Sequence, residues 1–534
     1  MSIDLYLYLR FYTNEWSLCR KEGRICDGYR CSECAYFTAH KECAESPPEI
    51  ESPSHPKHPL KLLRSEDYFF KPCDCCREYT SEVAYHCSVC DFWADVYCAR
   101  NPPTLSFLSL TTHEHILTLL PIKISFTCNA CGMDGYWSPY ACLQCYFVIH
   151  IQCIDLPRII NINRHDHRIS RMYCLDPEDP DPVCGVCRRP IDRRYGAYSC
   201  HSCPQYAVHS RCATLENVWD GNELYWKPEE VEDVEPFKVI AHNVIEHFSH
   251  KQHHLRFMED GYGCEASIRC KACIRPINSS SLYSCMKCDF FLHERCANLP
   301  LKKRHMVFGQ QLFLHANPAP YLWSWCYVCE QFSDGFKYIT SDNGFTIDAQ
   351  CSSIREPFDI ECHHHPLYYT SSETGRCKAC AKLKMYVLRC VEDGCEYALC
   401  FGCVGLPSTV KHDCDDHPLV LCYGEKQERG KYWCDICEEK TDPNLWFYIC
   451  NHCGLTLHVG CVLGEDLAYF EPGSLIPRPL NSGGEEAYEV VANKGSQRPL
   501  CYNCSRRCMS SVALKKRDGT GRYLCSYKCY SVFG

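Results

Sequence analysis

One pattern of cysteines and histidines recurs along the chain and limits what it can fold into. Its clearest copy runs from His250 to Cys296 and holds eight metal-ligand residues in four pairs. The pairs are His250 and His253, Cys270 and Cys273, Cys285 and Cys288, and His293 and Cys296. Two cysteines in Cys-x-x-Cys can hold one side of a tetrahedral Zn²⁺ ion, and His-x-x-Cys can supply the other two ligands. Eight ligands therefore predict two zinc ions in each complete copy.

The spacing of the last two pairs excludes one way of sharing the ligands. The residues between Cys288 and His293 are typical of a short strand, with Phe290 and Leu292 on one face. If extended at about 3.3 Å per residue, this segment separates the two ligands by roughly 16 Å, which one ion cannot bridge. We therefore expect these pairs in different sites. Spacing alone leaves open whether the sites are crossed, and whether His253 or His254 is a ligand.

These residues resemble the plant divergent C1 (DC1) family, the cysteine/histidine-rich relatives of the C1 domain of protein kinase C. The matching motifs are His-x-x-His-x-Leu from His250, Cys-x-x-Cys, and Tyr-x-Cys-x-x-Cys-x-Phe-x-Leu-His-x-x-Cys ending at Cys296. The resemblance implies small zinc-stabilised α+β or irregular modules, C1-like cross-brace zinc fingers, in a tandem array. It also implies the crossed sharing, in which the histidine pair joins Cys285 and Cys288, and Cys270 and Cys273 join His293 and Cys296.

The cysteine content has two possible explanations, which the histidines separate. The chain has 534 residues with 50 Cys and 26 His. A secreted disulfide scaffold is also rich in cysteine, but it has no use for a histidine at a fixed distance. The first ten residues lack the features of a signal peptide, and no apolar run approaches the roughly 18 residues of a membrane span. We therefore expect an intracellular protein, in the cytoplasm and/or the nucleus.

The charge argues against nucleic acid as a partner. The formal net charge is −10, and each Cys₃His zinc site adds about one negative charge. Sequence-independent binding to nucleic acid depends on basic contacts to phosphate. We therefore expect proteins as partners, with lipid as a possibility.

The pattern divides the chain into repeats. We expect DC1-like repeats at residues 14–45 (truncated), 54–99, 112–154, 164–213, 248–297, 304–352 (degenerate), 361–404 and 411–462. An acidic, solvated linker is expected at 216–247, and a Cys-rich zinc-binding segment at 499–531.

The second, third and fourth copies supply most of the N-terminal ligands. The second has Asp95 where a histidine is expected, and a carboxylate oxygen can also bind zinc. Its predicted ligands are His55, His58, Cys73, Cys76, Cys87, Cys90, Asp95 and Cys98. The third copy offers His113, His115, Cys128, Cys131, Cys142, Cys145, His150 and Cys153, and the fourth His165, His167, Cys184, Cys187, Cys200, Cys203, His209 and Cys212.

The seventh copy is altered, with a widened Cys390–Cys395 pair, whereas the eighth is the most typical copy. Cys400 replaces a histidine in the seventh, which predicts a Cys₄ site. The predicted ligands of the seventh are Cys362, His365, Cys377, Cys380, Cys390, Cys395, Cys400 and Cys403. Those of the eighth are Cys414, His417, Cys434, Cys437, Cys450, Cys453, His458 and Cys461, with His412 as an alternative to Cys414.

The remaining copies are damaged. The first has Trp16 at a cysteine position and predicts one partial site at best, with Cys26 as the candidate to complete it. In the sixth, Thr340 and Asn343 replace cysteines, so one site is lost; the other could persist with Cys326, Cys329, Asp348 and Cys351. The C-terminal segment offers Cys501, Cys504, Cys525 and Cys529.

The ligand sets indicate structure rather than catalysis. A site with four protein ligands is closed, whereas catalytic zinc keeps an open position. We therefore expect no enzyme, but a multi-module protein-interaction or signalling adaptor, with lipid or diacylglycerol binding as the alternative. A protein-disulfide reductase or a ubiquitin ligase fits the pattern less well. Residues 404–410 are typical of a linker, so we expect the repeats to fold as separate beads.

Overall fold

The computed structural model describes most of the chain, and the repeats are numbered here as modules 1 to 8. It describes residues 5–7, 28–31, 38–64, 71–75, 79–80, 83–101, 104–109, 112–120, 122, 124–136, 138–175, 182–228, 234–259, 268–277, 281–316, 324–341, 344–370, 374–412, 414–424, 432–464, 470, 472–476, 488–493, 498–510, 512–526 and 529–530. The chain divides into two compact units: Met1–Ile159, Ile169–Cys184 and Arg189–Arg211 form one, and Ile160–Arg168, Gly185–Arg188 and Cys212–Gly534 form the other.

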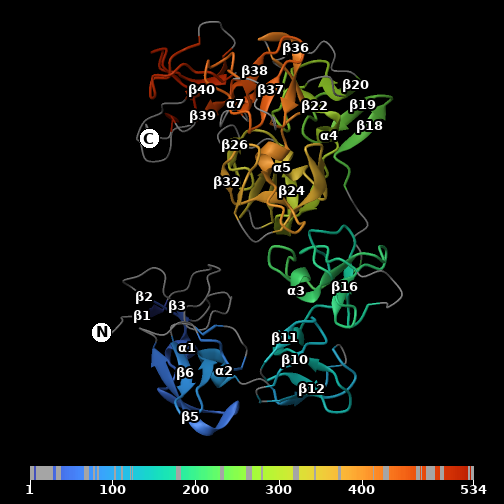
Figure 1. Cartoon of the computed structure of the whole chain (residues 1–534), viewed down its shortest axis with the longest axis vertical. Coiled ribbons are helices and arrows are strands. Elements are labelled where there is room, and N and C mark those ends of the chain that lie inside the picture. Colours follow the sequence, from blue (N-terminus) through green and yellow to red (C-terminus); the bar gives the residue numbers. More distant parts are fainter. Residues whose placement is uncertain are drawn as a thin grey trace. The chain divides into compact units, whose positions relative to one another are not determined.

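Module 2 shows the common plan, an antiparallel sheet of four short strands followed by a helix of about one turn (Figure 1). Its elements are β4 (Glu49–Ser52), β5 (His55–Arg64), β6 (Val83–Cys87), β7 (Phe92–Asp95) and α2 (Val96–Arg100). The sheet buries Leu60, Tyr85 and Ala94 on one face. A helix this short is not stable by itself in water, so its fixed position depends on the residues that hold its two ends.

The other modules of the first unit follow the plan with shorter strands. Module 1 has β1 (Leu5–Leu7), β2 (Gly28–Cys31), β3 (Thr38–His40) and α1 (Lys41–Ala44). Module 3 has β8 (Ser106–Phe107), β9 (Leu117–Leu119), β10 (Phe126–Thr127), β11 (Asp134–Gly135), β12 (Tyr140–Cys142), β13 (Val148–Ile149) and the 3-10 helix η1 (Ile151–Cys153). Module 4, whose segments belong to both units, has β14 (Ile159–Ile160), β15 (Ile169–Met172), β16 (Ala197–Ser199), β17 (Ala207–His209) and α3 (Ser210–Ala213).

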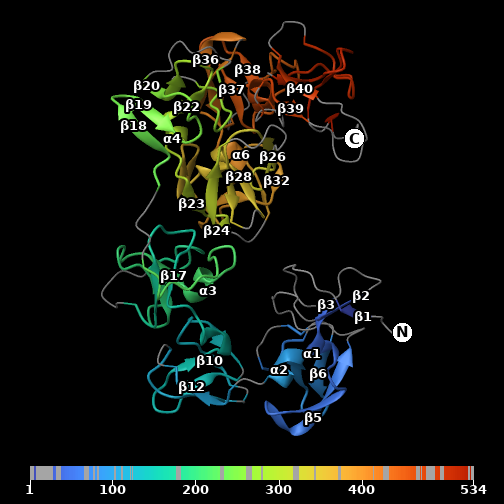
Figure 2. The same cartoon turned by 180° about the vertical axis from the view of Figure 1, so that it is seen from behind.

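Modules 5 to 8 and the C-terminal segment complete the second unit (Figure 2). Module 5 has β18 (Phe237–Ala241), β19 (Val244–His247), β20 (Leu255–Met258), β21 (Leu282–Cys285), β22 (Phe291–His293) and α4 (Glu294–Ala297). Module 6 has β23 (Lys302–His305), β24 (Phe308–His315), β25 (Ser324–Cys326), β26 (Gln331–Ser333), β27 (Lys337–Thr340), β28 (Thr346–Asp348) and α5 (Ala349–Ser352). Module 7 has β29 (Phe358–Ile360), β30 (His363–Tyr369), β31 (Gly375–Arg376), β32 (Leu383–Lys384), β33 (Val387–Cys390), β34 (Ala398–Cys400) and α6 (Phe401–Val404). Module 8 has β35 (Thr409–His412), β36 (Asp415–Cys422), β37 (Phe447–Ile449), β38 (Thr456–His458) and α7 (Val459–Leu463), and the C-terminal sheet has β39 (Leu475–Ile476), β40 (Tyr488–Ala492), β41 (Val512–Lys516) and β42 (Tyr523–Leu524).

Part of the predicted acidic linker is folded. Strands β18 and β19 lie within residues 216–247 and pair with β20 in a five-stranded sheet, so module 5 begins earlier than the metal ligands indicate. His247 at the end of β19 is fully buried and bonds through Nε2 to the carbonyl of Ala297, 3.2 Å away. Burial lowers the pKa of His247 to about 4, so this histidine is a neutral core residue.

A buried tyrosine ties five of the modules to the segment that precedes each of them. It lies two residues before the first cysteine of the second Cys pair, or before Thr340 in module 6, and its hydroxyl donates to a carbonyl. The bonds run from Tyr85 to Pro47 (2.7 Å), Tyr140 to Thr104 (2.5 Å), Tyr198 to Pro157 (2.5 Å), Tyr338 to Pro300 (2.6 Å) and Tyr448 to Pro407 (2.8 Å). Each ring is at most 2% exposed. Each tyrosine therefore packs in the core of its module and also holds the preceding segment through its hydroxyl group.

Removing one of these hydroxyl groups should weaken its module. Tyr140→Phe keeps the ring but removes a part-buried hydrogen bond to the carbonyl of Thr104, which contributes about 0.5–1.5 kcal/mol. We expect faster amide exchange across residues 104–154. Tyr146→Phe is the matched control, because Tyr146 is fully exposed in the same module. Equal exchange in both variants would show that the hydroxyl group of Tyr140 does not stabilise the module.

Modules dock on one another through the turn inside the first Cys pair, which we call the knuckle. In modules 5 and 7 the knuckle alanine accepts a backbone hydrogen bond from the next module: Phe336 N to Ala272 O is 2.9 Å, and Trp446 N to Ala379 O is 3.0 Å. In module 3 the carbonyl of the knuckle alanine also accepts a hydrogen bond from the next module, but from a side chain: Ser210 Oγ donates to Ala130 O over 2.7 Å. The even modules have Cys75, Val186, Val328 and Ile436 at the knuckle position. The repeating unit is therefore a pair of modules, 3 with 4, 5 with 6, and 7 with 8.

Two glycines make the closest of these contacts possible. A Cβ atom on Gly335 would lie 2.2 Å from the carbonyl oxygen of Ala272. A Cβ atom on Gly196 would lie 2.5 Å from that of Ala130. Both distances are far below van der Waals contact, so the backbones approach as closely as they do only because these residues lack a side chain.

Modules 5 to 8 share one hydrophobic core, so the prediction of separate beads is wrong for this part of the chain. The core is continuous from Ile245 to Leu463. The segment 404–410, predicted as a linker, is part of it: Val410 is 1% exposed. The carbonyl of Gly405 accepts a 2.5 Å bond from Gln350 Nε2 of module 6. The physical reason is that each module buries only one face of its small sheet, and the neighbours cover the rest.

Module 6 has replaced its lost metal site with apolar packing. The turn between β23 and β24 buries Met306, Val307 and Phe308, and the ring of Phe308 stacks on Phe345 at 5.3 Å. Thr340, at the position of a ligand cysteine, accepts a bond from Phe345 N over 3.0 Å. This packing occupies the end of the sheet where complete modules place their histidine pair.

The segment Ile160–Arg168 docks on this turn within the second unit. Asn163 Nδ2 donates to the carbonyls of His305 (3.1 Å) and Phe308 (2.9 Å). The adjacent Arg164 has a fully buried side chain and pairs with Glu356 at 2.6 Å. Arg188 reaches the same carboxylate at 3.0 Å. A buried carboxylate held by two arginines therefore fastens this segment to modules 6 and 7.

Candidate metal centres

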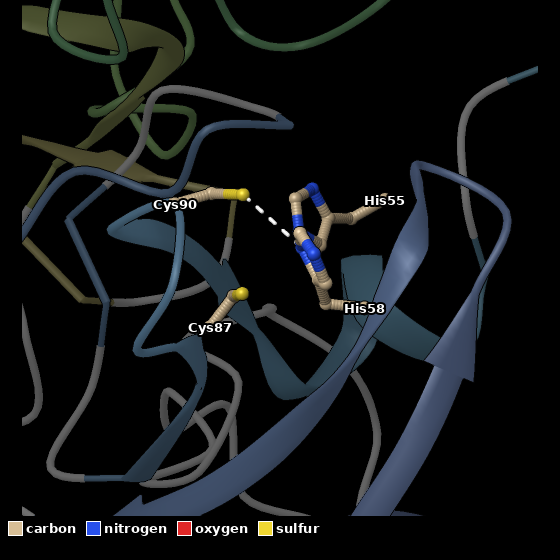
Figure 3. A group of neighbouring side chains, drawn as sticks. All are labelled: His55, His58, Cys87 and Cys90. Carbon is tan, nitrogen blue, oxygen red and sulfur yellow. Dashed lines mark hydrogen bonds between the residues drawn. The ribbon is translucent and has the colours of Figure 1, made fainter.

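The first cluster forms where strand ends of module 2 meet. His55 and His58 lie at the start of β5, Cys87 ends β6, and Cys90 lies in the turn that follows (Figure 3). The four ligand atoms lie within 4.8 Å of one another, and Cys90 Sγ is 3.2 Å from His58 Nδ1. We call this arrangement, a histidine pair with the second Cys pair, the hairpin site.

A second cluster forms at the other end of the sheet. It joins the first Cys pair to a histidine at the end of the last strand and a cysteine in the short helix, and we call it the helix site. In module 3 it consists of Cys128, Cys131, His150 and Cys153, and the three cysteines are buried. The hairpin site of that module consists of His113, His115, Cys142 and Cys145. The ligand pairs are thus shared in the crossed manner.

Modules 4 and 5 repeat the crossed arrangement. Module 4 groups His165 and His167 with Cys200 and Cys203, and Cys184 and Cys187 with His209 and Cys212. In module 5, His250 Nε2 is 3.4 Å from the sulfurs of both Cys285 and Cys288, and His253 Nδ1 is 3.8 Å from Cys288. Its helix site brings His293 Nδ1 within 3.4 Å of Cys273 and 3.9 Å of Cys296, and Cys270 completes the group. Of the two candidates left open, His253 rather than His254 faces the thiols.

Backbone N–H groups donate hydrogen bonds to ligand sulfur atoms in both kinds of site. His150 N donates to Cys128 Sγ over 3.4 Å, and His293 N donates to Cys270 Sγ over 3.5 Å. In the hairpin sites, Gln144 N and Lys287 N donate to Cys142 and Cys285 over 3.3 and 3.4 Å. Such bonds favour the thiolate, which is the form that binds metal.

In modules 2, 3, 5 and 7 the surroundings of the first histidine of the hairpin pair also favour metal binding. It stacks on an aromatic ring that follows the second Cys pair: His55 on Phe92 (4.7 Å), His113 on Phe147 (4.3 Å), His250 on Phe290 (4.3 Å) and His363 on Tyr397 (4.2 Å). Burial, and then the neighbouring histidine, lower the pKa of these imidazoles below the ordinary value. The neutral imidazole is the form that binds metal.

The structure corrects one predicted ligand in module 7. His363 Nε2 lies 3.6 Å from Cys395 Sγ, and His365 Nδ1 lies 3.8 Å from Cys390 Sγ. The predicted ligand Cys362 instead contacts the hydroxyl of Tyr397 at 3.1 Å. Residues 363 and 365 lie on one face of strand β30 because side chains alternate, whereas residues 362 and 365 do not.

Module 8 departs from the prediction in the same way. Asp415, two residues before His417, is 3.5 Å from Cys453 Sγ, and His417 Nδ1 is 3.4 Å from the same sulfur. Neither of the two predicted alternatives joins the cluster: Cys414 and His412 contact each other at 3.0 Å. A hydrogen bond from the Cys450 thiol, together with the backbone N–H of His417, holds the pKa of Asp415 well below its usual range. The sequence did contain a signal for both corrections: His363 and Asp415 each lie two residues before the histidine of a His-Pro-Leu motif.

The helix sites of modules 7 and 8 contain the predicted residues. The thiols of Cys377, Cys380, Cys400 and Cys403 hydrogen-bond one another, so the four sulfurs of the predicted Cys₄ site lie close together. His458 Nδ1 lies 3.2 Å from Cys437 and 3.9 Å from Cys461. A hydrogen bond from Cys461 lowers the pKa of Cys434 to about 4.

Aspartate takes the histidine position in modules 2 and 6. Asp95 Oδ1 accepts from Cys98 N, and Asp348 Oδ1 accepts from Cys351 N, each over 2.7 Å. Each carboxylate thereby caps its short helix. Asp95 N also donates to Cys73 Sγ over 3.3 Å. The predicted ligand Cys76 lies outside the described residues, as do Trp16, Cys26 and Asn343.

The C-terminal segment brings its four cysteines together as predicted. Cys525 Sγ is 3.6 Å from the sulfurs of both Cys504 and Cys529, and Cys501 hydrogen-bonds to Cys504. Cys508 is buried in the same small core. The segment is therefore a separate Cys₄ cluster on its own four-stranded sheet.

The correction in module 7 gives a direct test by metal content. His363→Ala removes a ligand and should lower the metal bound per chain by one ion. Cys362→Ser should leave the metal content unchanged, because its sulfur faces Tyr397. Elemental analysis of both purified variants decides between them, and the reverse result would restore Cys362 as the ligand.

The fold and its paired clusters define a class of protein, a tandem array of small cysteine/histidine modules. A family model described as C1 domain matches residues 53–99, 111–154, 163–213, 248–297 and 412–462. A second model, described as C1 domain-like, C-terminal, matches residues 488–530. No curated protein and no solved structure matches the chain.

The chain therefore belongs with proteins built from tandem C1 domains, and the predicted resemblance to the divergent C1 family is confirmed. Modules 6 and 7 lie outside the matched ranges but have the same sheet order. Within the part of the chain that the structure describes, the helices are too short or too polar to cross a bilayer.

Proposed function

We propose that the chain is a zinc-binding interaction scaffold that acts as an intracellular signalling adaptor. The observation that carries this proposal is the set of closed four-ligand clusters at both ends of small sheets that pack on one another. Thiolate and imidazole ligands at these distances suit zinc. The ion would neutralise the buried thiolates and hold each short helix to its sheet.

The same ligand sets argue against catalysis. Four protein ligands complete a tetrahedral shell and leave no position for water or substrate. The thiols also need a reducing compartment to stay free for metal. A non-catalytic, intracellular role in the cytoplasm and/or the nucleus follows from these two points.

Module 3 offers the best surface for a protein partner. Ile116, Leu143 and Tyr146 each adjoin a ligand of its hairpin site, so they lie close together around that site. Their exposed fractions are 54%, 74% and 102%. An exposed apolar patch of this kind is typical of an interaction site, and several modules in one chain add avidity.

Affinity purification of the zinc-loaded chain with mass spectrometry tests this role. The double variant Leu143→Asp/Tyr146→Asp should lose a defined set of protein partners. Val239→Asp is the matched control, because Val239 is 72% exposed on strand β18 of module 5. Unchanged partners in the double variant would refute the module 3 surface. Sedimentation of the wild type, but not of the double variant, with diacylglycerol-containing vesicles would favour lipid as the ligand instead.

A further inference from the structure

Module 6 gathers four ligand groups although no family model matches it. Cys326 and Cys329 flank the knuckle, Asp348 ends β28, and Cys351 lies in α5. Their exposed fractions are 1%, 5%, 4% and 2%. Cys329 Sγ is 3.1 Å from Asp348 Oδ2, and the thiol of Cys351 hydrogen-bonds to those of Cys326 and Cys329.

The geometry matches that of the complete helix sites. Asp348 N donates to Cys326 Sγ over 3.5 Å, just as His293 N donates to Cys270 Sγ over 3.5 Å in module 5. The two oxygens of the Asp348 carboxylate have different contacts: Oδ1 caps α5, and Oδ2 faces the sulfurs. A histidine in this position leaves the helix without a side-chain cap, as His293 does.

We infer that module 6 holds one zinc ion on Cys326, Cys329, Asp348 and Cys351, and that this ion fixes the junction between modules 5, 6 and 7. The inference rests on the zinc binding proposed for the whole array. Three thiolates and one carboxylate bring four negative charges to one divalent ion. The half-buried Lys303 lies nearby, and its ammonium group donates to the carbonyl of Ser352, next to Cys351.

The proposed role at the junction depends on Gln350, which lies between the ligands Asp348 and Cys351 in the sequence. Gln350 of α5 accepts a 2.8 Å bond from Arg275 of module 5 and donates a 2.5 Å bond to Gly405 O of module 7. The neighbouring Ala349 N bonds to Phe336 O, and Phe336 N docks on the knuckle of module 5. A metal that holds α5 at Asp348 and Cys351 therefore holds Gln350 between its two partners.

Zinc content of the full-length protein tests the site. Cys329→Ser should bind one ion fewer than the wild type. Cys174→Ser is the matched control, because Cys174 is exposed and outside the clusters described here, and it should bind the same number. Asp348→His should also bind the same number, but should lose that ion to a chelator more slowly, since imidazole is the softer ligand.

The outcomes separate this inference from the proposed function. A wild-type chain without zinc would refute both. A zinc-loaded wild type with an unchanged count in Cys329→Ser would refute only the module 6 site. Should Cys329→Ser fail to fold, Asp348→His decides: an unchanged count supports the site, and a gain of one ion shows that the wild-type site does not bind zinc.

Discussion

His458→Ala is expected to accelerate amide exchange throughout residues 245–463, well beyond module 8. The substitution removes the ligand that faces Cys437 at 3.2 Å and leaves three thiols in the helix site. A structural zinc contributes on the order of 10–16 kcal/mol to a small module, comparable with the whole stability of a domain. Because module 8 shares its core with modules 5 to 7, the loss should spread to them.

Hydrogen exchange with mass spectrometry measures how far the effect extends. His150→Ala is the matched control: it removes the corresponding ligand from module 3, which has a core of its own. We expect its effect to leave residues 245–463 protected. Loss of protection confined to residues 412–462 in His458→Ala would show that the modules unfold independently despite their packed interfaces.

Glu356→Ala is expected to release the segment 160–168 from modules 6 and 7. The substitution leaves Arg164, whose side chain is fully buried, without its carboxylate partner and removes the acceptor of Tyr369 N at 2.8 Å. Breaking a buried ion pair by removing one partner costs about 3–5 kcal/mol. The larger share of that cost comes from the arginine charge that stays behind.

Asp192→Ala provides the control for this prediction. Asp192 also pairs with an arginine, Arg194 at 2.6 Å, but the two side chains are 44% and 79% exposed. An exposed pair contributes little because water screens it. We expect faster exchange in residues 160–168 and 356–369 only in Glu356→Ala, together with a lower urea midpoint. Similar behaviour of the two variants would mean that the Glu356 cluster does not hold the segment.

The local chemistry of this protein could be read from its sequence, because each ligand pair is encoded within a few residues. The crossed sharing in module 5 could be narrowed down by the length of one strand and was then implied by the family resemblance. The choice between Cys362 and His363, or between Cys414 and Asp415, could not be settled in this way. It depends on which side chains share a face of a strand, and therefore on where that strand begins.

The contacts between modules could not be predicted for a different reason. Arg164 and Glu356 are 192 residues apart, and nothing in their neighbourhoods marks them as partners. The knuckle contacts depend on Ala272 and Gly335, two small residues of ordinary types. Their significance comes from the absence of a side chain where two backbones meet, which no ligand motif reports.

The alternation of the knuckle residue has a consequence for how such an array can change in length. Ala130, Ala272 and Ala379 stand in modules 3, 5 and 7, while the even modules carry larger residues. Loss of one odd module, or duplication of one even module, would make two even modules neighbours, so that a valine or isoleucine would face a surface shaped for alanine, at a typical overpacking cost of about 1–3 kcal/mol. Gain or loss of two adjacent modules keeps alanine and larger residues alternating at the knuckle position. Recombination in this gene should therefore be tolerated in steps of two, and deletion of modules 5 and 6 together should disturb the rest of the chain less at its knuckles than deletion of module 5 alone, which would bring Val186 against the surface of module 6 that receives Ala272.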